Sequence, residues 1–107
     1  MQGDIVKLSA GPRQGHEQRG YRPYICLSHK LISDWANIAI FAPISNTARK
    51  YPLYVLLERT KTTGLVLLDQ LVTLDYNARK FQYIETVPMD YLHALLEKVA
   101  LIFQRNF

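Results

Sequence analysis

The chain contains 107 residues, of which 49% are hydrophobic and 21% are charged, a composition that excludes a disordered, collagen-like or coiled-coil protein. Its length predicts a single domain spanning residues 1–107, long enough to bury one hydrophobic core. The net charge is +4, with +5 in residues 1–81 and −1 in residues 82–107. This balance favours either a phosphate-bearing partner or a basic surface that serves only solubility.

Short apolar stretches separated by turn residues predict a mainly β protein. In chain order, strands are expected over residues 4–9, 21–28, 37–44, 53–57, 65–68, 71–74 and 81–87, because each stretch is short and rich in aliphatic or aromatic residues. Residues 12–20 are polar and contain glycines, which predicts a loop. Residues 29–35 are ambiguous, with one or two helical turns as the best interpretation.

The end of the chain changes from strand to helix periodicity. Apolar residues recur at helical spacing at positions 92, 95, 96, 99, 102 and 103, so we expect an amphipathic helix over residues 88–103. Pro88 suits the first helical position and Asp90 suits the first turn. Short strands followed by one helix predict a small, strongly bent sheet or barrel.

The sequence favours a cytoplasmic protein with no membrane association. No apolar run approaches the roughly 18 residues that a membrane-spanning helix requires. The first residues, MQGD, lack the basic and apolar regions of a secretory signal. Cys26 is the only cysteine, so we expect no internal disulfide, which suits a reducing compartment.

No metal site or other cofactor is expected from the sequence. His16 and Glu17 begin like a zinc-protease motif, but Gly20 stands where the second histidine ligand is required. A single cysteine cannot build a zinc knuckle. The chain also has no glycine loop that would cradle a phosphate and no nucleophile elbow.

Polar residues gather instead in four short motifs, GHEQ at 15–18, GYRP at 20–23, PISNT at 43–47 and DQ at 69–70. The segment GHEQRGYRPYICLS at 15–28 resembles the G-[SH]-E-Q-x-G-x-R-P signature of the MazF/PemK/Kid toxin family. GDIV at 3–6, APISNTARKYP at 42–52, GLVLLDQLVTLDYNAR at 64–79 and VP at 87–88 resemble further family motifs. The motifs occur in the family's order over nearly the whole chain.

The resemblance implies a fold, an activity and partners. The fold is a twisted SH3-like β-barrel with a C-terminal helix, of the PemK/CcdB type, assembled as a homodimer. The activity is sequence-specific, metal-independent cleavage of single-stranded mRNA. The ribose 2′-OH attacks the adjacent phosphorus and leaves a 2′,3′-cyclic phosphate and a 5′-OH. A cognate antitoxin, an acidic and flexible peptide, blocks the site.

Three residues are assigned to catalysis by the resemblance. Arg22 is the central one, because its planar, permanently charged guanidinium suits the oxygens of a phosphate in the transition state. Ser45 stands where the family usually has a catalytic threonine, and His16 titrates near neutral pH and could shuttle a proton. The substrate-binding residues are expected to be Glu17, Gln18, Arg19, Thr47, Asp69 and Gln70.

Each assignment has a simpler structural alternative. Arg22 alone is typical of a surface salt bridge, Ser45 of a hydroxyl that closes a turn, and His16 of a solvated loop residue. Glu17 could hold a neighbouring guanidinium in place. Asp69 could be a buried aspartate that caps local amides.

Two positions depart from the family pattern. Relatives often have arginine or a polar residue where this chain has Leu67, and commonly arginine where it has Val72. Any part that those arginines play in acid catalysis or base recognition is therefore lost or moved in this chain.

The remaining aromatic and apolar residues give further expectations. Four tyrosines either stack on unpaired bases or belong to the core, namely Tyr21, Tyr51, Tyr54 and Tyr76. Cys26 and Trp35 are expected to pack and to anchor a loop. Several apolar positions exceed what one helix can cover, and some are expected to contact a second copy of the chain: Leu53, Leu65, Leu67 and Phe81.

Two other functions compete with ribonuclease activity. A CcdB-like topoisomerase poison has the same fold, but it acts through its C-terminal residues and a near-terminal tryptophan. This chain ends QRNF, and its one tryptophan is Trp35. A family member that binds RNA or antitoxin without cutting remains open, because serine replaces threonine at position 45 and two family arginines are lost.

Overall fold

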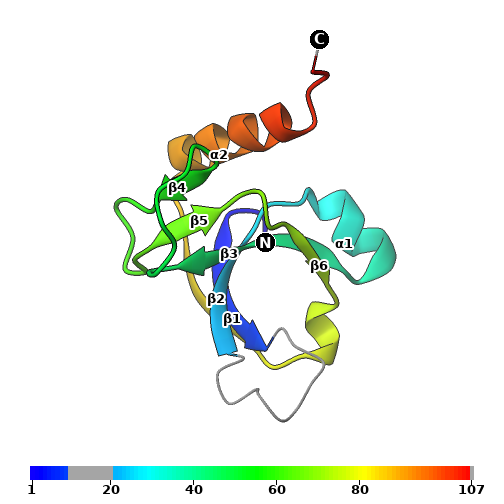
Figure 1. The fold of residues 1–107 in the computed structure, drawn as a ribbon. Coiled ribbons are helices and arrows are strands. Elements are labelled where there is room, and N and C mark those ends of the chain that lie inside the picture. Colours follow the sequence, from blue (N-terminus) through cyan, green and yellow to red (C-terminus); the bar gives the residue numbers. More distant parts are fainter. Residues whose placement is uncertain (10–20, 107) are drawn as a thin grey trace.

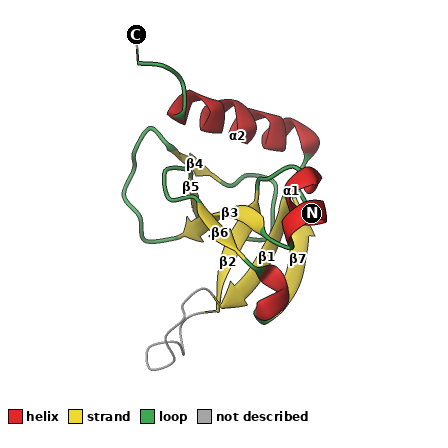
Figure 2. Ribbon diagram, turned by 90° about the vertical axis from the view of Figure 1, so that its right-hand side faces the viewer, coloured by secondary structure: helices red, strands yellow, loops and turns green. Residues whose placement is uncertain are grey.

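The computed structural model describes residues 1–9 and 21–106, which form a strongly curved antiparallel sheet with a helix across one face (Figure 1, Figure 2). The strands are β1 (Asp4–Ser9), β2 (Tyr21–Cys26), β3 (Ala39–Ser45), β4 (Tyr54–Leu56), β5 (Leu65–Leu67), β6 (Val72–Leu74) and β7 (Phe81–Thr86). The helices are α1 (Lys30–Ala36), the short 3-10 helix η2 (Tyr76–Ala78) and α2 (Met89–Ile102). The predicted class, mainly β with a C-terminal helix, is confirmed.

The strand β3 is the branching point of the sheet. It pairs with β2 over Phe41–Pro43 on one side. On its other side it pairs first with β6, over Ala39–Phe41, and then with β5, over Ile44–Ser45. The sheet therefore divides along β3, and a shift of pairing between β1 and β7 at Ile5 and Val6 bends it further.

Alternating side chains give the sheet a buried cluster on each face. On one face, Ile5, Ile25 and Ala42 belong to the larger cluster, which α2 covers with Leu92 and Leu95. On the other face lies a second cluster, which β6 covers through Leu74. Its buried residues are Val6, Leu8, Tyr24, Cys26, Ala39, Phe41 and Leu74. Because successive side chains point to opposite faces and both faces are covered, consecutive residues such as Ile5 and Val6 are both buried.

The two ends of the strand order β4-β5-β3-β2-β1-β7 are joined by one side chain. The Glu85 carboxylate on β7 accepts hydrogen bonds from Lys61 N at 3.0 Å, Thr62 N at 2.7 Å and Thr62 Oγ1 at 2.8 Å, in the loop between β4 and β5. Burial acts to raise the pKa of Glu85, but these hydrogen bonds favour the charged form and hold the pKa below its usual value.

The helix α2 holds the end of β4 and the loop that follows it. Tyr91 donates its hydroxyl to the carbonyl oxygen of Leu56 at 2.7 Å, and burial, with a smaller contribution from the charge of Glu58, raises the pKa of Tyr91 to about 12. Arg59 donates to both carboxylate oxygens of Asp90 at 3.1 Å. That hydrogen bond lowers the pKa of Asp90, which is an exposed group.

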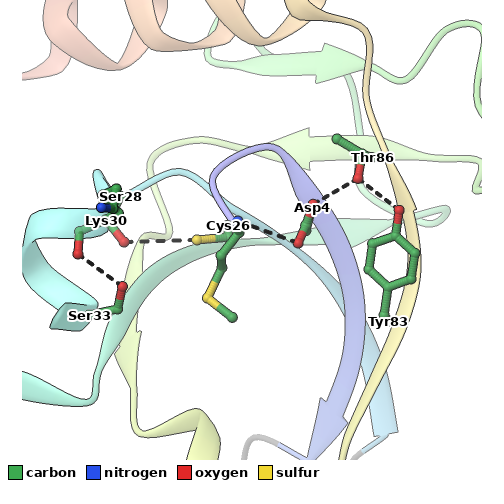
Figure 3. Close-up of polar contacts among 8 residues, drawn as sticks. Asp4, Cys26, Ser28, Lys30, Ser33, Tyr83 and Thr86 are labelled. Atoms are coloured by element: carbon green, nitrogen blue, oxygen red, sulfur yellow. Dashed lines mark hydrogen bonds and ion pairs between the residues drawn. The ribbon is translucent and has the colours of Figure 1, made fainter.

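The first strand is tied to the last by a chain of polar contacts (Figure 3). Thr86 Oγ1 donates to Asp4 Oδ1 at 2.8 Å, and the Tyr83 hydroxyl lies 2.8 Å from Thr86 Oγ1. Because the threonine hydrogen points to the carboxylate, the tyrosine hydroxyl is the donor in the second contact. The side chain of Cys26 is buried, as expected, and burial raises the pKa of its thiol.

The ambiguous segment at 29–35 is the helix α1. It begins because His29 Nδ1 accepts a hydrogen bond from Leu31 N at 3.0 Å, and it ends at Asn37, whose φ is 57°. This end delays the start of β3 to Ala39. The expectation that Trp35 packs was wrong: its side chain is 84% exposed, because α1 buries no residue completely. No helix in the described ranges is long and apolar enough to cross a bilayer.

The apolar residues expected to contact a second chain differ in exposure. Leu67 is 7% exposed and is packed within one chain, so it is not available to a partner. Leu53 and Leu65 are partly buried, and Phe81 is 39% exposed. Met89, which the sequence analysis did not single out, is more exposed than these at 80%. Phe103 was expected on the apolar face of the C-terminal helix, but it follows the last residue of α2 and is 74% exposed.

Gly64 is expected to be intolerant of substitution. Its φ is +130°, and a Cβ there would lie 2.8 Å from the carbonyl oxygen of Ser45. Gly64→Ala should lower the free energy of unfolding by at least the ~1–3 kcal/mol of a strained backbone, measured by urea denaturation. Gly3→Ala is the control, because Gly3 also has a positive φ but its Cβ would meet a movable Leu92 carbon at 3.2 Å. Equal losses in the two variants would show that the contact with Ser45 is unimportant.

Candidate functional site

Arg22 is the second residue of β2 and is exposed, opposite Leu8 on β1. Alternation along the strand places Arg22 on the same face as Tyr24, at the rim of the second cluster. Burial raises the pKa of the Tyr24 hydroxyl, while the charges of Arg22 and Arg79 act to lower it. Both guanidinium groups therefore lie within electrostatic reach of the same phenol.

Arg79 is a second cation at this rim, and sequence reasoning missed it. Its Nη1 donates to the carbonyl oxygen of Ser9 at 2.8 Å, and Ser9 is paired with Tyr21 at the start of β2. Its Nε is buried and has no hydrogen-bond acceptor among residues 1–9 and 21–106. The available signal was its place as the last residue of the motif GLVLLDQLVTLDYNAR.

The hydroxyls of Ser45 and Thr47 form one unit at the end of β3. Ser45 Oγ accepts from Thr47 N at 3.1 Å and lies 3.2 Å from Thr47 Oγ1. Ser45 thus does close the turn, as its structural alternative proposed. Two hydroxyls share two hydrogens, and their mutual bond uses one, so one hydrogen remains for a third atom.

Arg22 and Ser45 lie at the same end of the β2–β3 pair. The recorded register joins Tyr24 to Pro43, and continuing it by two residues would place Arg22 opposite Ser45. Antiparallel pairing brings the start of β2 beside the end of β3. The Arg22 guanidinium and the Ser45–Thr47 hydroxyl pair therefore lie at neighbouring strand ends.

Asp69 and Gln70 belong to a separate pocket. A cavity of about 330 Å³ is lined by Arg49, Lys50, Tyr51, Tyr54 and Asp69. Asp69 is exposed, so the alternative of a buried, amide-capping aspartate is wrong. The tyrosine rings of the pocket meet edge to face with centroids 4.7 Å apart, and the Tyr54 hydroxyl accepts from Gln70 Nε2 at 3.0 Å. This pocket offers cations, aromatic faces and a carboxylate.

The loop between β3 and β4 connects the two groups. It begins at the turn of Ser45 and Thr47 and reaches the pocket at Arg49, Lys50 and Tyr51. Of the other tyrosines, Tyr21 is exposed, whereas Tyr76 is partly buried against the second cluster, which favours a core role. Candidate residues outside the described part of the chain are His16, Glu17, Gln18 and Arg19.

Metal ligands do not gather anywhere in the described ranges. Within residues 1–9 and 21–106, no three side chains of histidine, cysteine, aspartate or glutamate lie close enough together to hold an ion. His29 caps α1, and His93 lies 3.3 Å from Glu97 on the exposed face of α2. The polar groups at the strand ends are instead cations and hydroxyls.

Comparison with known proteins gives consistent matches over nearly the whole chain. Residues 1–103 match the family described as PemK-like, MazF-like toxin of type II toxin–antitoxin system. The endoribonuclease PemK of Escherichia coli is 30% identical over 105 residues, covering 94% of this chain and 79% of PemK. The endoribonuclease toxin MazF of E. coli K12 is 26% identical over 100 residues, covering 94% and 90%. The crystal structure of MazF from Deinococcus radiodurans has a TM-score of 0.78 and 29% identity, covering 94% and 93%.

Proposed function

This chain belongs to the PemK-like, MazF-like toxins of type II toxin–antitoxin systems, and we propose that it cleaves single-stranded mRNA at specific sequences, with Arg22 and Ser45 at the reacting phosphate. The curated relatives PemK and MazF are endoribonucleases. The observation that supports the proposal is that two cations, Arg22 and Arg79, lie at the adjoining ends of β1 and β2, while the Ser45–Thr47 hydroxyl pair lies at the end of β3, the strand that pairs with β2.

The proposed reaction is an internal transfer within the RNA. The ribose 2′-oxygen forms a bond to phosphorus, the bond from phosphorus to the 5′-oxygen breaks, and that oxygen takes up a proton. The products are a 2′,3′-cyclic phosphate and a 5′-OH. The crowded phosphorane carries additional negative charge, which positioned cations and hydroxyl donors stabilise.

Arg22 has the role of a clamp on the phosphate oxygens. A guanidinium presents a rigid fork of donors that fits two oxygens of one phosphate. A guanidinium stays charged and has no lone pair to accept a proton, so removal of the 2′-proton belongs to another group, for which His16 is the candidate. Arg79 adds a second positive charge beside Tyr24, and Ser45 or Thr47 donates the free hydroxyl hydrogen.

The pocket of Arg49, Lys50, Tyr51, Tyr54 and Asp69 is the proposed site for a neighbouring nucleotide. Unpaired bases stack on aromatic side chains, and cations accompany the phosphates. Asp69 and the amide of Gln70 can hydrogen-bond to base edges. Glu17, Gln18, Arg19 and Thr47 complete the proposed binding residues.

The proposed partners follow from the family and from the charge of the chain. A cognate acidic antitoxin peptide competes with RNA for the basic surface that contains Arg22 and orders on binding. A cytoplasmic location gives both mRNA and antitoxin access to the site. A homodimer of this chain would extend the basic surface across two copies.

Cleavage is expected to proceed in EDTA and to leave 5′-OH ends. The cations that act on the phosphate are side chains of the protein, so chelation of divalent ions should leave the rate unchanged. The purified chain is incubated with a long single-stranded RNA, and the new ends are mapped by their acceptance of phosphate from a polynucleotide kinase. Loss of cleavage in EDTA, or 5′-phosphate ends, would contradict the proposed chemistry.

Substitutions of Arg22 and Ser45 should distinguish the contribution of positive charge, of guanidinium geometry and of the hydroxyl to cleavage. Arg22→Ala should abolish cleavage with the fold retained, and Arg22→Lys should also fail, because a point charge cannot form the bidentate contact. Ser45→Ala should lose about tenfold in kcat, equivalent to ~1.4 kcal/mol in the barrier.

The matched controls carry the same changes at exposed positions elsewhere. Arg105→Ala removes a positive charge beyond α2, and Ser33→Ala removes an exposed hydroxyl that donates to Lys30 O at 3.1 Å in α1. Both controls should cleave at the unsubstituted rate. Cleavage by Arg22→Ala at that rate would refute the assignment.

The chain is expected to form a dimer at micromolar concentration. Large apolar side chains remain exposed on one copy, including Leu56 at 57% and Phe81 at 39%, and a closed two-fold pair would cover them. Light scattering coupled to gel filtration should give twice the 12.4 kDa of one chain. A 12.4 kDa particle with full ribonuclease activity would exclude an obligatory dimer.

A further inference from the structure

The loop between β4 and β5 contains none of the proposed site residues, but it contacts Ser45 and the turn that follows it. On its outer side, Thr62 is held by both its backbone N–H and its hydroxyl to one oxygen of the Glu85 carboxylate, at 2.7 and 2.8 Å. Lys61 N donates to the other oxygen at 3.0 Å. Three hydrogen bonds to one charged group fix this part of the loop firmly to β7.

The inner side of the same loop contacts Ser45 and its neighbour. Leu65 pairs directly with Ser45 at the end of β3. Gly64 lies so close that a Cβ would come within 2.8 Å of the Ser45 carbonyl oxygen and 3.0 Å of its carbon. Thr63 Oγ1 donates to Asn46 Oδ1 at 3.2 Å, within the turn that joins Ser45 to Thr47.

The segment between the two contacts is too short and too constrained to absorb a movement. One residue, Thr63, separates Thr62 from Gly64. The carbonyl oxygen of Gly64 accepts from Leu57 N at 2.9 Å, and Thr60 Oγ1 donates to Thr62 O at 2.7 Å. A shift of Thr62 is therefore passed to the backbone that packs against Ser45, because close-packed backbone has no free space.

We propose that Glu85 is a positioning residue for cleavage: by fixing Thr62, it holds the 63–65 backbone against Ser45 and so sets the place of the Ser45–Thr47 hydroxyl pair. This inference rests on the proposed catalytic role of Ser45. Glu85 touches neither of those hydroxyls, and acts through the loop between β4 and β5.

The ion pair of Arg59 with Asp90 provides a matched comparison. It also ties this loop to the rest of the chain, but it joins the loop at Arg59, three residues before Thr62, and both side chains are exposed. Asp90→Asn weakens a loop contact and removes one negative charge, as Glu85→Gln does. The two variants differ in whether the lost contact lies on the path to Ser45.

The experiment measures cleavage kinetics and amide hydrogen exchange in the full-length chain. In Glu85→Gln, one acceptor oxygen is replaced by an NH₂ donor, so either Lys61 N or both donors of Thr62 lose their acceptor, and the charge that strengthened all three hydrogen bonds is gone. We expect kcat to fall roughly tenfold with KM little changed, less than the ~100-fold that a 1 Å misplacement can cost. Exchange at residues 45–47 should become faster in the RNA-free protein. Asp90→Asn should leave kcat and that exchange unchanged.

A double-substitution cycle tests whether Glu85 acts through Ser45. If it does, Glu85→Gln should cause no further loss of kcat once Ser45→Ala is present. A full additional tenfold loss in that background would overturn the proposal, since the effect would then be general destabilisation. Thr63→Val is the second variant in case Glu85→Gln folds poorly. It removes the hydroxyl that donates to Asn46, and it should also accelerate exchange at 45–47.

The exchange measurement separates this inference from the proposed function. Unchanged exchange at 45–47 in Glu85→Gln, with faster exchange only at 60–62, would overturn the link between the loop and Ser45 even if the chain cleaves RNA. Faster exchange at 45–47 together with unaltered cleavage by Ser45→Ala would instead overturn the catalytic role of Ser45, and with it the positioning of a reacting group.

Discussion

The pairing of β3 with three other strands is the constraint on which the rest of the structure depends. Because β6 takes the first half of one edge and β5 the second half, the two strands diverge and the sheet opens into separate layers. One layer packs against α2, and the other closes around Phe41 and Tyr24. Ser45, at the end of β3, is placed where the β5 branch begins.

This arrangement places the two groups of candidate residues on different structural elements. Arg22 and Arg79 sit at the rim of the second cluster, whereas Tyr51, Tyr54 and Asp69 line a pocket near the sheet edge formed by β4. The loop between β3 and β4 is the connection between them. A substitution in that pocket therefore acts on different elements from those that hold Arg22 and Arg79.

Much of the fold was predictable because its strands are local apolar patterns. The helix α1 was ambiguous because its start depends on the His29 side chain and its surface buries no residue completely, so it has no clear periodicity. Motif resemblance selected Arg22 and Ser45 as candidates, and the antiparallel register places them at neighbouring strand ends. The resemblance did not select Arg79, and it gave no measure of how far the candidate binding residue Asp69 lies from Ser45. The hydrogen bonds of Glu85 to Thr62 join residues 23 apart in sequence, and no local pattern reveals such a pair.

The one tryptophan stands on the surface of α1, with 84% of its side chain in water. Its indole is already solvated in the folded chain, so its emission should change little when the chain unfolds in denaturant. Intrinsic fluorescence is thus a weak monitor of folding for this protein. Because Trp35 is exposed in the free protein, a macromolecule that binds over α1 and covers the indole should shift its fluorescence emission to shorter wavelength.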